Sequence, residues 1–507
     1  MTTPIEHLYH RAGRSPNAIA IAGPGEPFTY RRLLTAAHAF AAALQSLDPD
    51  PGSRVGICAR NTVEHLLALL ATYAAGKVWV PLNPTNSRAD LDRMIGATRP
   101  TLFVADESCL ESFSHTDAPI VLAKTTGAPG EMPSVRGLIA EWNGRHPTVI
   151  AREDSDAQII KFSGGSTGAP KPVVQSVRCV NAQVQGILAC FELDAGDVNL
   201  IAAPLTHGAS CFVLPILSVG GRHVMIEEPK APRVLDAIER YAVTTMYAPP
   251  TLIYSMLEDP TVTTRSYGRM RHLIYSAAPM RPEQIRRAQR VFGPVVETAY
   301  GQVEAPQIIT AMRARELEHD ENVTSIGRHS PVAEVAIMGP TGDLLPNGET
   351  GEIIVRGPLV MNGYLDRPDL TAQTIIDGWL HTGDLGMMDD RGYVYIRGRL
   401  RELINTGGFK VFPGDVEAVL ATHAAVAECA VFGVPDDKWG EAVHAAVRVS
   451  DGAALTAEDL MAFVKAELGS VKSPKVIHFI PALPRNAAGK VSRAAVRAMV
   501  QASDNQR

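Results

Sequence analysis

The sequence predicts an α/β protein that consists of a large amino-terminal domain and a small carboxy-terminal one. The large domain is expected to hold two helix-covered, mostly parallel sheets and a small sheet that resembles a β-barrel. Two observations predict this fold class. A chain of 507 residues is too long for one hydrophobic core, and the hydrophobic pattern alternates between strand and helix over long stretches.

The first part of the chain shows this alternation clearly. The pattern predicts two helices, over residues 29–47 and 63–75, and three strands, over residues 17–22, 54–58 and 78–81. The same alternation recurs over residues 198–275. Strands that alternate with helices are typical of parallel sheets whose faces are covered by helices.

The pattern changes twice farther along the chain. Residues 331–397 contain short alternating strands separated by Gly, Asn and Asp, which is typical of a smaller antiparallel or barrel-like sheet. From about residue 402 a compact α+β unit is expected, with helices over 413–421 and 456–468 and strands over 426–432, 442–448 and 475–480. The main boundary is expected between Arg397 and Glu402, which gives domains of residues 1–400 and 401–507.

Composition excludes several classes of protein. Apolar residues make up 46% of the chain, charged residues make up 20%, and the net charge is −6, without the basic stripe of a nucleic-acid-binding protein. None of the six cysteines has the spacing of a zinc or dithiol site. The first residues lack an apolar signal core, and the apolar stretch Leu66–Ala75 is too short to span a bilayer. A cytoplasmic protein without a membrane span is therefore expected.

A glycine-rich loop follows the apolar run at residues 158–160. Its glycines allow the backbone to approach an anion closely, and its hydroxyls and lysine are donors suited to phosphate oxygens. The spacing is not that of a Walker A loop, and a plain hydrophilic connection is the alternative. The residues expected to bind phosphate are Ser163, Gly164, Gly165, Ser166, Thr167, Gly168 and Lys171.

This loop resembles the signature loop of the adenylate-forming superfamily, which includes acyl- and aryl-CoA synthetases. Gly164 stands where a serine is common, and Pro172 stands where a glycine is common. The resemblance implies that the loop holds the β- and γ-phosphates of ATP. Further motifs of the family follow in the family's order over nearly the whole chain, which is stronger evidence than any one motif.

Three of these motifs resemble the acyl pocket and the nucleotide site. The segment 204–207 resembles the motif whose histidine, here His207, lines the acyl pocket and gates the thiol tunnel. Residues 276–279, with Ala278, and the pair Tyr300 and Gly301 resemble the two walls of an adenine slot. Without the resemblance, a structural histidine and a core tyrosine are the alternatives.

The segment 300–304 resembles the Tyr-Gly-x-Thr-Glu motif of the family. The resemblance implies that Glu304 ligates a magnesium ion on the triphosphate, a task suited to a hard carboxylate oxygen. Val303 departs from the motif because valine lacks the hydroxyl that would bond to the α-phosphate. Such a bond to a charged oxygen contributes about 1.5–3 kcal/mol unless another donor replaces it.

The remaining motifs fall near and beyond the expected domain boundary. Asp384 resembles the aspartate that accepts bonds from both ribose hydroxyls, with a turn-stabilising role as the alternative, and Arg399 resembles a second ribose contact. Arg401 stands at the family's hinge position, about which a small mobile lid domain rotates. Also carried over by resemblance are the coenzyme A tunnel glycines Gly407 and Gly408 and the catalytic lysine Lys490.

The sequence therefore predicts an AMP-forming acid–CoA ligase that uses ATP, Mg²⁺ and coenzyme A. It would convert a carboxylic acid to its acyl-adenylate and pass the acyl group to coenzyme A. Two alternatives stay open: an adenylation enzyme that loads a carrier-protein thiol, and a degenerate member that binds nucleotide without turnover. The identity of the acid is not evident, and a homodimer is compatible with the sequence.

The lid hypothesis gives a first testable prediction. Lys490→Ala should slow adenylate formation by roughly 10²–10³-fold, the scale of removing one preorganised charge donor, and leave thioester formation from synthetic acyl-adenylate nearly unchanged. Arg401→Pro should do the reverse, because proline fixes φ at the hinge. Each half-reaction is assayed separately in both variants. Equal slowing of both halves by Lys490→Ala would contradict a two-state lid.

Overall fold

The computed structural model of the chain describes residues 3–23, 25–114, 116–124, 132–163, 170–450, 452–485 and 491–504. The chain divides into two compact units, which are described separately. The first unit comprises Met1–Ser163, Pro170–Val335 and Val355–Leu380, and the second comprises Gly164–Ala169, Ala336–Ile354 and His381–Arg507. The boundary expected between residues 400 and 401 falls inside the second unit and stays a prediction.

A nine-stranded sheet forms one half of the first unit, in the order β15-β14-β13-β12-β11-β9-β10-β1-β2. The strands from β1 to β13 along this order are parallel, and the edge strands β2, β14 and β15 are antiparallel to their neighbours. The bounds are β1 (Ile19–Ala22), β2 (Phe28–Thr29), β9 (Val198–Ile201), β10 (Arg222–Met225), β11 (Thr245–Ala248), β12 (His272–Tyr275), β13 (Val296–Tyr300), β14 (Thr310–Met312) and β15 (Arg328–His329).

A seven-stranded sheet forms the other half, in the order β18-β8-β7-β4-β3-β5-β6. Strands β7, β4, β3, β5 and β6 are parallel, whereas β8 and β18 are antiparallel. The bounds are β3 (Arg54–Cys58), β4 (Val78–Pro81), β5 (Leu102–Ala105), β6 (Ile120–Leu122), β7 (Ala157–Ser163), β8 (Lys171–Ser176) and β18 (Gly363–Tyr364).

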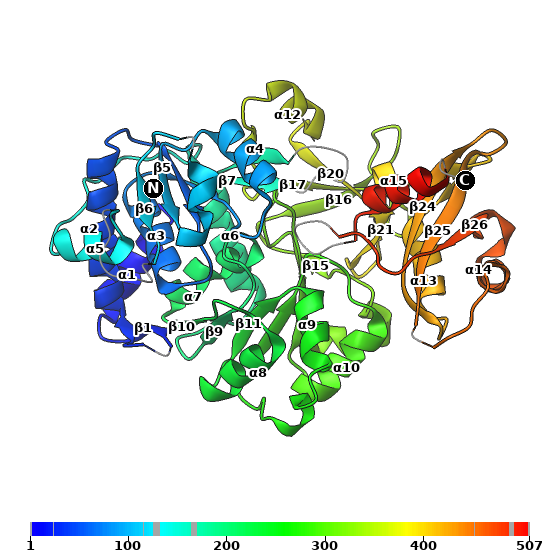
Figure 1. Cartoon of the computed structure of the whole chain (residues 1–507), viewed down its shortest axis with the longest axis horizontal. Helices are drawn as coiled ribbons and strands as arrows, with labels where there is room; N and C mark the ends of the chain where they lie inside the picture. The colour runs from blue at the N-terminus through cyan, green and yellow to red at the C-terminus, as the bar shows by residue number, and fades with distance from the viewer. Residues whose placement is uncertain are drawn as a thin grey trace. The chain divides into compact units, whose positions relative to one another are not determined.

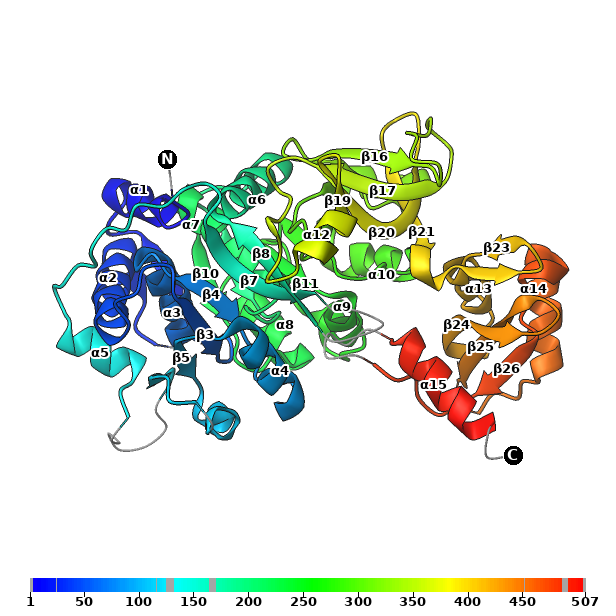
Figure 2. The same ribbon diagram turned by 90° about the horizontal axis from the view of Figure 1, so that it is seen from above.

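Helices cover these sheets and fill the space between them (Figures 1 and 2). One core joins apolar side chains of both sheets to those of α1, α2, α3, α6 and α7, and every residue of α3 from Glu64 to Ala74 is buried. Side-chain oxygens of Thr29, Thr62 and Ser176 cap the first turns of α2, α3 and α6. The bounds are α1 (Glu6–Arg14), α2 (Tyr30–Leu47), α3 (Val63–Ala74), α4 (Arg88–Thr98), α5 (Val135–Glu141), α6 (Val177–Cys190), α7 (Val213–Val219), α8 (Ala231–Arg240), α9 (Pro250–Leu257), α10 (Pro282–Phe292), α11 (Ala314–Leu317) and α12 (Pro368–Thr374).

A smaller sheet follows in the order β16-β17-β20-β19, with β21 paired to β20. The pairings of β20 with β19 and β21 are antiparallel, and β20 carries an irregularity between Leu385 and Gly386. Its strands are β16 (Glu334–Met338), β17 (Gly351–Arg356), β19 (Ile375–Ile376), β20 (Trp379–Met388) and β21 (Val394–Arg399).

The carboxy-terminal part of the second unit is an α+β sandwich. Its sheet has the order β23-β22-β25-β24, with β26 parallel to β25. Because successive side chains of a strand face opposite sides, Val431 packs in the core with α13 and α14, whereas its neighbours Ala430 and Phe432 pack with α15. The bounds are β22 (Ile404–Thr406), β23 (Phe409–Val411), α13 (Pro413–Leu420), β24 (Val426–Asp436), β25 (Gly440–Val449), α14 (Ala457–Lys472), β26 (Val476–Phe479) and α15 (Arg493–Asp504). The predicted α/β fold class is confirmed.

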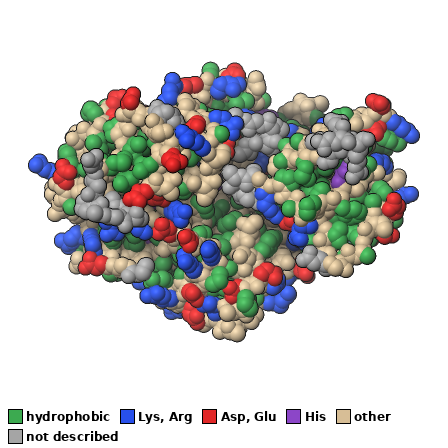
Figure 3. Space-filling model, in the orientation of Figure 1, with side chains coloured by type: hydrophobic (Ala, Val, Ile, Leu, Met, Phe, Trp, Pro, Cys, Tyr) green, Lys and Arg blue, Asp and Glu red, His purple; other side chains and the backbone are tan. Residues whose placement is uncertain are grey.

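Two further findings concern the hydropathy of the helices and the charge of the surface. Among the described residues, no helix is both long and apolar enough to cross a membrane. On the face drawn in Figure 3, acidic and basic side chains are interspersed among apolar ones.

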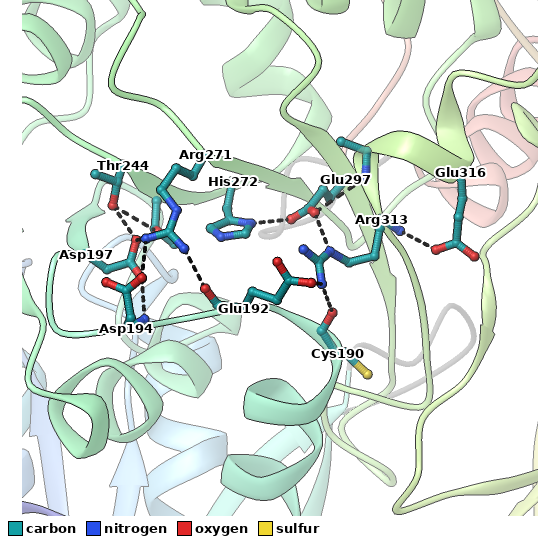
Figure 4. A network of polar contacts seen from close by, with 12 residues as sticks. Cys190, Glu192, Asp194, Asp197, Thr244, Arg271, His272, Glu297, Arg313 and Glu316 are labelled. Atoms are coloured by element: carbon teal, nitrogen blue, oxygen red, sulfur yellow. Dashed lines mark hydrogen bonds and ion pairs between the residues drawn. The ribbon is translucent and has the colours of Figure 1, made fainter.

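A buried polar network lies at the amino ends of the parallel strands of the nine-stranded sheet (Figure 4). Glu297 on β13 is 1% exposed. Its Oε1 accepts from Arg313 Nε at 2.9 Å, and its Oε2 lies 2.8 Å from His272 Nδ1. Asp197, just before β9, is fully buried and accepts from the hydroxyls of Thr244 and Thr245 at 2.6 and 3.0 Å. These contacts compensate the buried carboxylates for the loss of water.

The network predicts a stability effect. Glu297→Ala should lower the free energy of unfolding by about 3 kcal/mol, because it leaves the partly buried Arg313 without this partner. Glu192→Ala is the control: this carboxylate also pairs with Arg313, but its side chain is 71% exposed, so its removal should cost less than about 1 kcal/mol. Urea denaturation of both variants measures the difference. Equal effects would contradict the assignment of Glu297 as the main partner.

Candidate active site

The predicted site residues of the first unit follow the carboxyl ends of parallel strands. His207 lies beyond β9, Ala278 lies beyond β12, and Glu304 lies beyond β13, in which Tyr300 is the last residue. Because parallel strands end on the same edge of a sheet, these loops share one edge, where open α/β sheets bind their ligands. Ala277, in the loop after β12, has a φ of 74°, in the left-handed region that non-glycine residues rarely adopt. Such backbone strain clusters at functional sites.

His207 combines exposure to solvent with a perturbed pKa. Desolvation by the surrounding protein and then the charge of Lys161 lower the pKa of His207 to about 4, so the ring is neutral at pH 7. The residue is nevertheless exposed, which is the combination expected of a side chain that lines an open recess. Its Nδ1 lies 2.9 Å from the hydroxyl of Thr206. A neutral ring beside a substrate acid neither attracts nor repels the carboxylate.

Lys161 is a residue of this site that the sequence analysis did not identify. Its ammonium donates to Ser210 Oγ at 2.9 Å and to the carbonyl oxygen of His207 at 3.3 Å, and lies 5.2 Å from the centre of the Trp79 ring. Burial lowers the pKa of Lys161. The signal was present as one lysine within the apolar run 159–162. This side chain ties β7, which leads into the glycine-rich loop, to the segment of His207.

Two glycines of the site are required by close contacts. A Cβ atom at Gly208 would collide with the ring and hydroxyl of Tyr247. A Cβ atom at Gly301 would lie 2.7 Å from the backbone nitrogen of Gln307. Gln307 in turn donates from Nε2 to Ser276 Oγ at 2.7 Å and lies 3.5 Å from the hydroxyl of Tyr247. A polar cluster of Tyr247, Ser276 and Gln307 therefore packs against the two glycines.

The segment 300–304 is held from two other strands. Gln175 on β8 donates to the carbonyl oxygen of Val303 at 2.8 Å, so this residue is fixed through its backbone rather than through a hydroxyl. The hydroxyl of Tyr364 on β18 donates to Glu304 Oε1 at 3.0 Å. Because 60 residues separate Tyr364 from Glu304, no local pattern in the sequence predicts this contact.

The glycine-rich loop is framed by a strand pair. Ser163 at the end of β7 pairs with Lys171 at the start of β8 in an antiparallel ladder. The ammonium of Lys171 lies 5.3 Å from the centre of the Tyr364 ring, within the range of a cation–π contact. The predicted phosphate-binding residues between them, Gly164, Gly165, Ser166, Thr167 and Gly168, lie outside the described residues.

In the second unit, the two predicted ribose contacts are neighbours. Asp384 on β20 and Arg399 on β21 are cross-strand partners, and Arg399 Nε lies 2.7 Å from Asp384 Oδ1. Asp384 is 3% exposed, although the guanidinium of Arg399 is partly open to solvent. A buried carboxylate held in place by an arginine is a fixed acceptor, as a hydroxyl-binding site requires.

The remaining predicted residues of this unit lie farther along the chain. Arg401 is exposed in the short 3₁₀ turn Leu400–Glu402. Gly407 and Gly408, with φ values of 57° and 83°, form the turn between β22 and β23. Lys490 lies outside the described residues, just before α15.

Family models match most of the chain. The model described as AMP-binding enzyme matches residues 8–365, and the model described as AMP-binding enzyme C-terminal domain matches residues 415–490. The chain belongs to this family of AMP-binding enzymes, as the loop and strand-end motifs predicted.

Similar proteins are themselves ligases. The chain is 34% identical over 475 residues to a medium/long-chain-fatty-acid–CoA ligase of Mycobacterium tuberculosis, covering 90% of this chain and 83% of that protein. It is 31% identical over 492 residues to a feruloyl-CoA synthase of an Amycolatopsis species, covering 96% and 97%. The crystal structure of ATP-bound MatB from Rhodopseudomonas palustris matches with a TM-score of 0.89 and 28% identity, covering 98% of this chain and 99% of that one. The predicted class, an ATP-using, AMP-forming acid–CoA ligase, is confirmed.

Proposed function

We propose that this chain binds ATP with Mg²⁺, couples a carboxylic acid to the α-phosphate with release of pyrophosphate, and then passes the acyl group to coenzyme A with release of AMP. The observation that carries this proposal is the arrangement around Glu304, where a carboxylate, a tyrosine and a lysine meet at the strand pair that frames the glycine-rich loop. Three chain segments that are far apart in the sequence converge there.

The donor set at Glu304 fits a magnesium ion carried by a nucleotide. Mg²⁺ is usually held by one or two carboxylates together with substrate phosphates and water, rather than by a cage of protein ligands. In agreement, the described residues contain no cluster of three or more His, Cys, Asp or Glu that could hold a metal ion. When bound, the ion would neutralise phosphate charge and polarise the phosphoryl group.

Tyr364 would keep Glu304 available for that ion. Its hydroxyl occupies Oε1 of Glu304, and its ring interacts with the ammonium of Lys171. The tyrosine thus holds two opposite charges in separate positions, one for the metal and one for a phosphate.

The chemistry needs such charges because both reactants are anions. A carboxylate attacks the α-phosphorus, a new C–O–P linkage forms, and the bond to pyrophosphate breaks. Lys490 and the donors of the loop would offset the repulsion and hold the atoms in line. His207, neutral at pH 7, would line the acyl pocket without adding charge. Asp384 would accept bonds from the ribose hydroxyls, and Arg399 would add a donor to them.

A surface feature of the second unit favours coenzyme A over a carrier protein as the acceptor. Trp439 is 40% exposed, and its ring lies 4.9 Å from Lys438 Nζ and 6.0 Å from Lys475 Nζ. Its carbonyl accepts from Gly407 N at 2.8 Å, so the feature adjoins the proposed thiol tunnel at Gly407 and Gly408. An exposed indole flanked by ammonium groups suits a nucleotide base and its phosphates. Carrier-protein loading is the second candidate.

Three further aspects belong to this proposal. We propose a lid of residues 401–507 that turns about Arg401, which would let the thiol enter where Lys490 had been. A cytoplasmic location is supported by six free cysteines, which suit a reducing compartment. A homodimer is proposed only as the simplest assembly.

The proposed reaction is tested by its products. The purified chain, with ATP and Mg²⁺, should release pyrophosphate in the presence of a panel of aryl and alkyl acids, and should form AMP and a thioester when coenzyme A is added. Parallel assays offer carrier proteins instead of coenzyme A. ADP and phosphate as stoichiometric products would contradict the proposal, and thioester on the carrier alone would favour the second candidate.

The role of Tyr364 gives a further prediction. Tyr364→Phe removes the hydroxyl but keeps the ring under Lys171, so it should raise the Mg²⁺ concentration needed for ATP binding roughly three- to ten-fold, the effect of one lost hydrogen bond. Isothermal titration with ATP at several Mg²⁺ concentrations measures this shift without turnover. Tyr395→Phe is the control, because this partly buried hydroxyl bonds to Asp389 instead. The same shift in both variants would contradict a specific role for Tyr364.

A further inference from the structure

The polar cluster of Tyr247, Ser276 and Gln307 contains an unsatisfied amide. Gln307 is 7% exposed, and its Nε2 is bonded to Ser276 and lies near Tyr247. Its Oε1 is fully buried and has no hydrogen-bond partner. Buried polar atoms in folded proteins almost always have partners, so an atom left without one requires an explanation.

Turning the side-chain amide of Gln307 by 180° would still leave one of its polar atoms without a hydrogen-bond partner. The two hydroxyls of Ser276 and Tyr247 can donate or accept, so the amide could be turned to present its oxygen to them. In that case the nitrogen would occupy the position that has no partner. In either orientation, one polar atom of Gln307 has no hydrogen-bond partner among the protein groups, and a ligand or a water molecule would supply one.

This position lies next to the segment of His207, which is predicted to line the acyl pocket, and next to Ser276 and Gly301, which belong to the predicted walls of the adenine slot. Tyr247 packs against Gly208, the residue after His207, and Gln307 packs against Gly301. Ser276 begins the loop after β12. The rings of Phe212 and Tyr247 lie 5.6 Å apart, which adds an apolar wall. The unsatisfied atom therefore lies among a small polar patch and an apolar ring, the mixture of groups that is usual in small-molecule sites.

The polar cluster of Tyr247, Ser276 and Gln307 favours an uncharged substrate group over a charged one. Burial raises the pKa of Tyr247 to about 12, so its hydroxyl is uncharged. Ser276 and Gln307 are uncharged as well, and a charged substrate group would lose its hydration without gaining a counter-charge from these three residues. A hydroxyl both donates and accepts, so it satisfies either orientation of the amide.

We propose that the acid activated by this chain carries a hydroxyl group on its body and that Gln307 recognises this hydroxyl, with Tyr247 and Ser276 as positioning residues. This inference rests on the proposed function, because it assigns the substrate of that same site. A site that is built to bond a hydroxyl discriminates strongly against the analogue that lacks it, because its own polar group is then left without a partner.

The test compares acids that differ by one hydroxyl. The pairs are 3-(4-hydroxyphenyl)propanoic acid with 3-phenylpropanoic acid, and 10-hydroxydecanoic acid with decanoic acid, each assayed by pyrophosphate release for kcat/KM. In at least one pair, the wild-type chain should prefer the hydroxylated acid by roughly 10- to 100-fold. Gln307→Leu should reduce this preference to about two-fold or less, by lowering kcat/KM more for the hydroxylated acid than for its partner. No preference in either pair overturns the inference.

A second glutamine provides the matched control for hydroxyl recognition. Gln45→Leu removes an amide whose bonds to Ala75 and Thr148 are complete, and should leave the preference intact. If Gln307→Leu slows both acids of a pair equally, or weakens ATP binding in titrations without acid, the amide serves a water molecule or the nucleotide, and the inference is overturned. Thermal unfolding confirms that the variant is folded, and Gln307→Met replaces it if it is not. Absence of pyrophosphate release with every acid would instead overturn the proposed function itself.

Discussion

The parallel hydrogen-bond ladder from β10 to β13 is the constraint on which the active site depends. Each strand is held in register by both neighbours, so the carboxyl ends of β9, β11, β12 and β13 are fixed relative to one another. The loops that carry His207, Ser276 and Glu304 all start from these ends. The opposite ends are secured by the buried contacts of Asp197 and Glu297. The buried stabilising contacts thus lie at the amino ends of the strands, and the loops of the candidate site lie at the carboxyl ends. The loops can therefore differ between relatives without loss of the core.

Three charged groups of the first unit bond to neutral partners. Lys161 is bonded to neutral oxygens, Lys171 lies over an aromatic ring, and Glu304 is bonded to a hydroxyl. If a triphosphate binds here as proposed, direct ion pairs between these groups would have to be broken first. Neutral partners would hold each charged group in place and lose less binding energy when the triphosphate arrives. By contrast, Arg399 does pair with Asp384, and that ion pair still leaves carboxylate lone pairs that can accept bonds.

The sequence predicted elements and motifs well, because both depend on residues that are close along the chain. The expected strand at 54–58 and helix at 63–75 match β3 and α3 to within one residue. Contacts across long separations were not predictable. Tyr364 reaches Glu304 across 60 residues, as Gln307 reaches Tyr247, and Lys161 approaches His207 across 46. Such contacts depend on how sheets and loops pack in three dimensions, which no local pattern encodes. The site roles carried over by resemblance stay predictions, and for Lys490 and the glycine-rich loop the described residues give no geometry.

One arginine of the second unit connects three of its segments. Arg493, in the first turn of α15, bonds to Glu402 at 2.6 Å and to both oxygens of Glu417 on α13 at 2.9 and 2.6 Å. These contacts connect the start of the last helix to the residue directly after Arg401 in the chain. If the proposed lid turns about Arg401, residue 402, α13 and the start of α15 would turn as one piece, because Arg493 bonds to both glutamates.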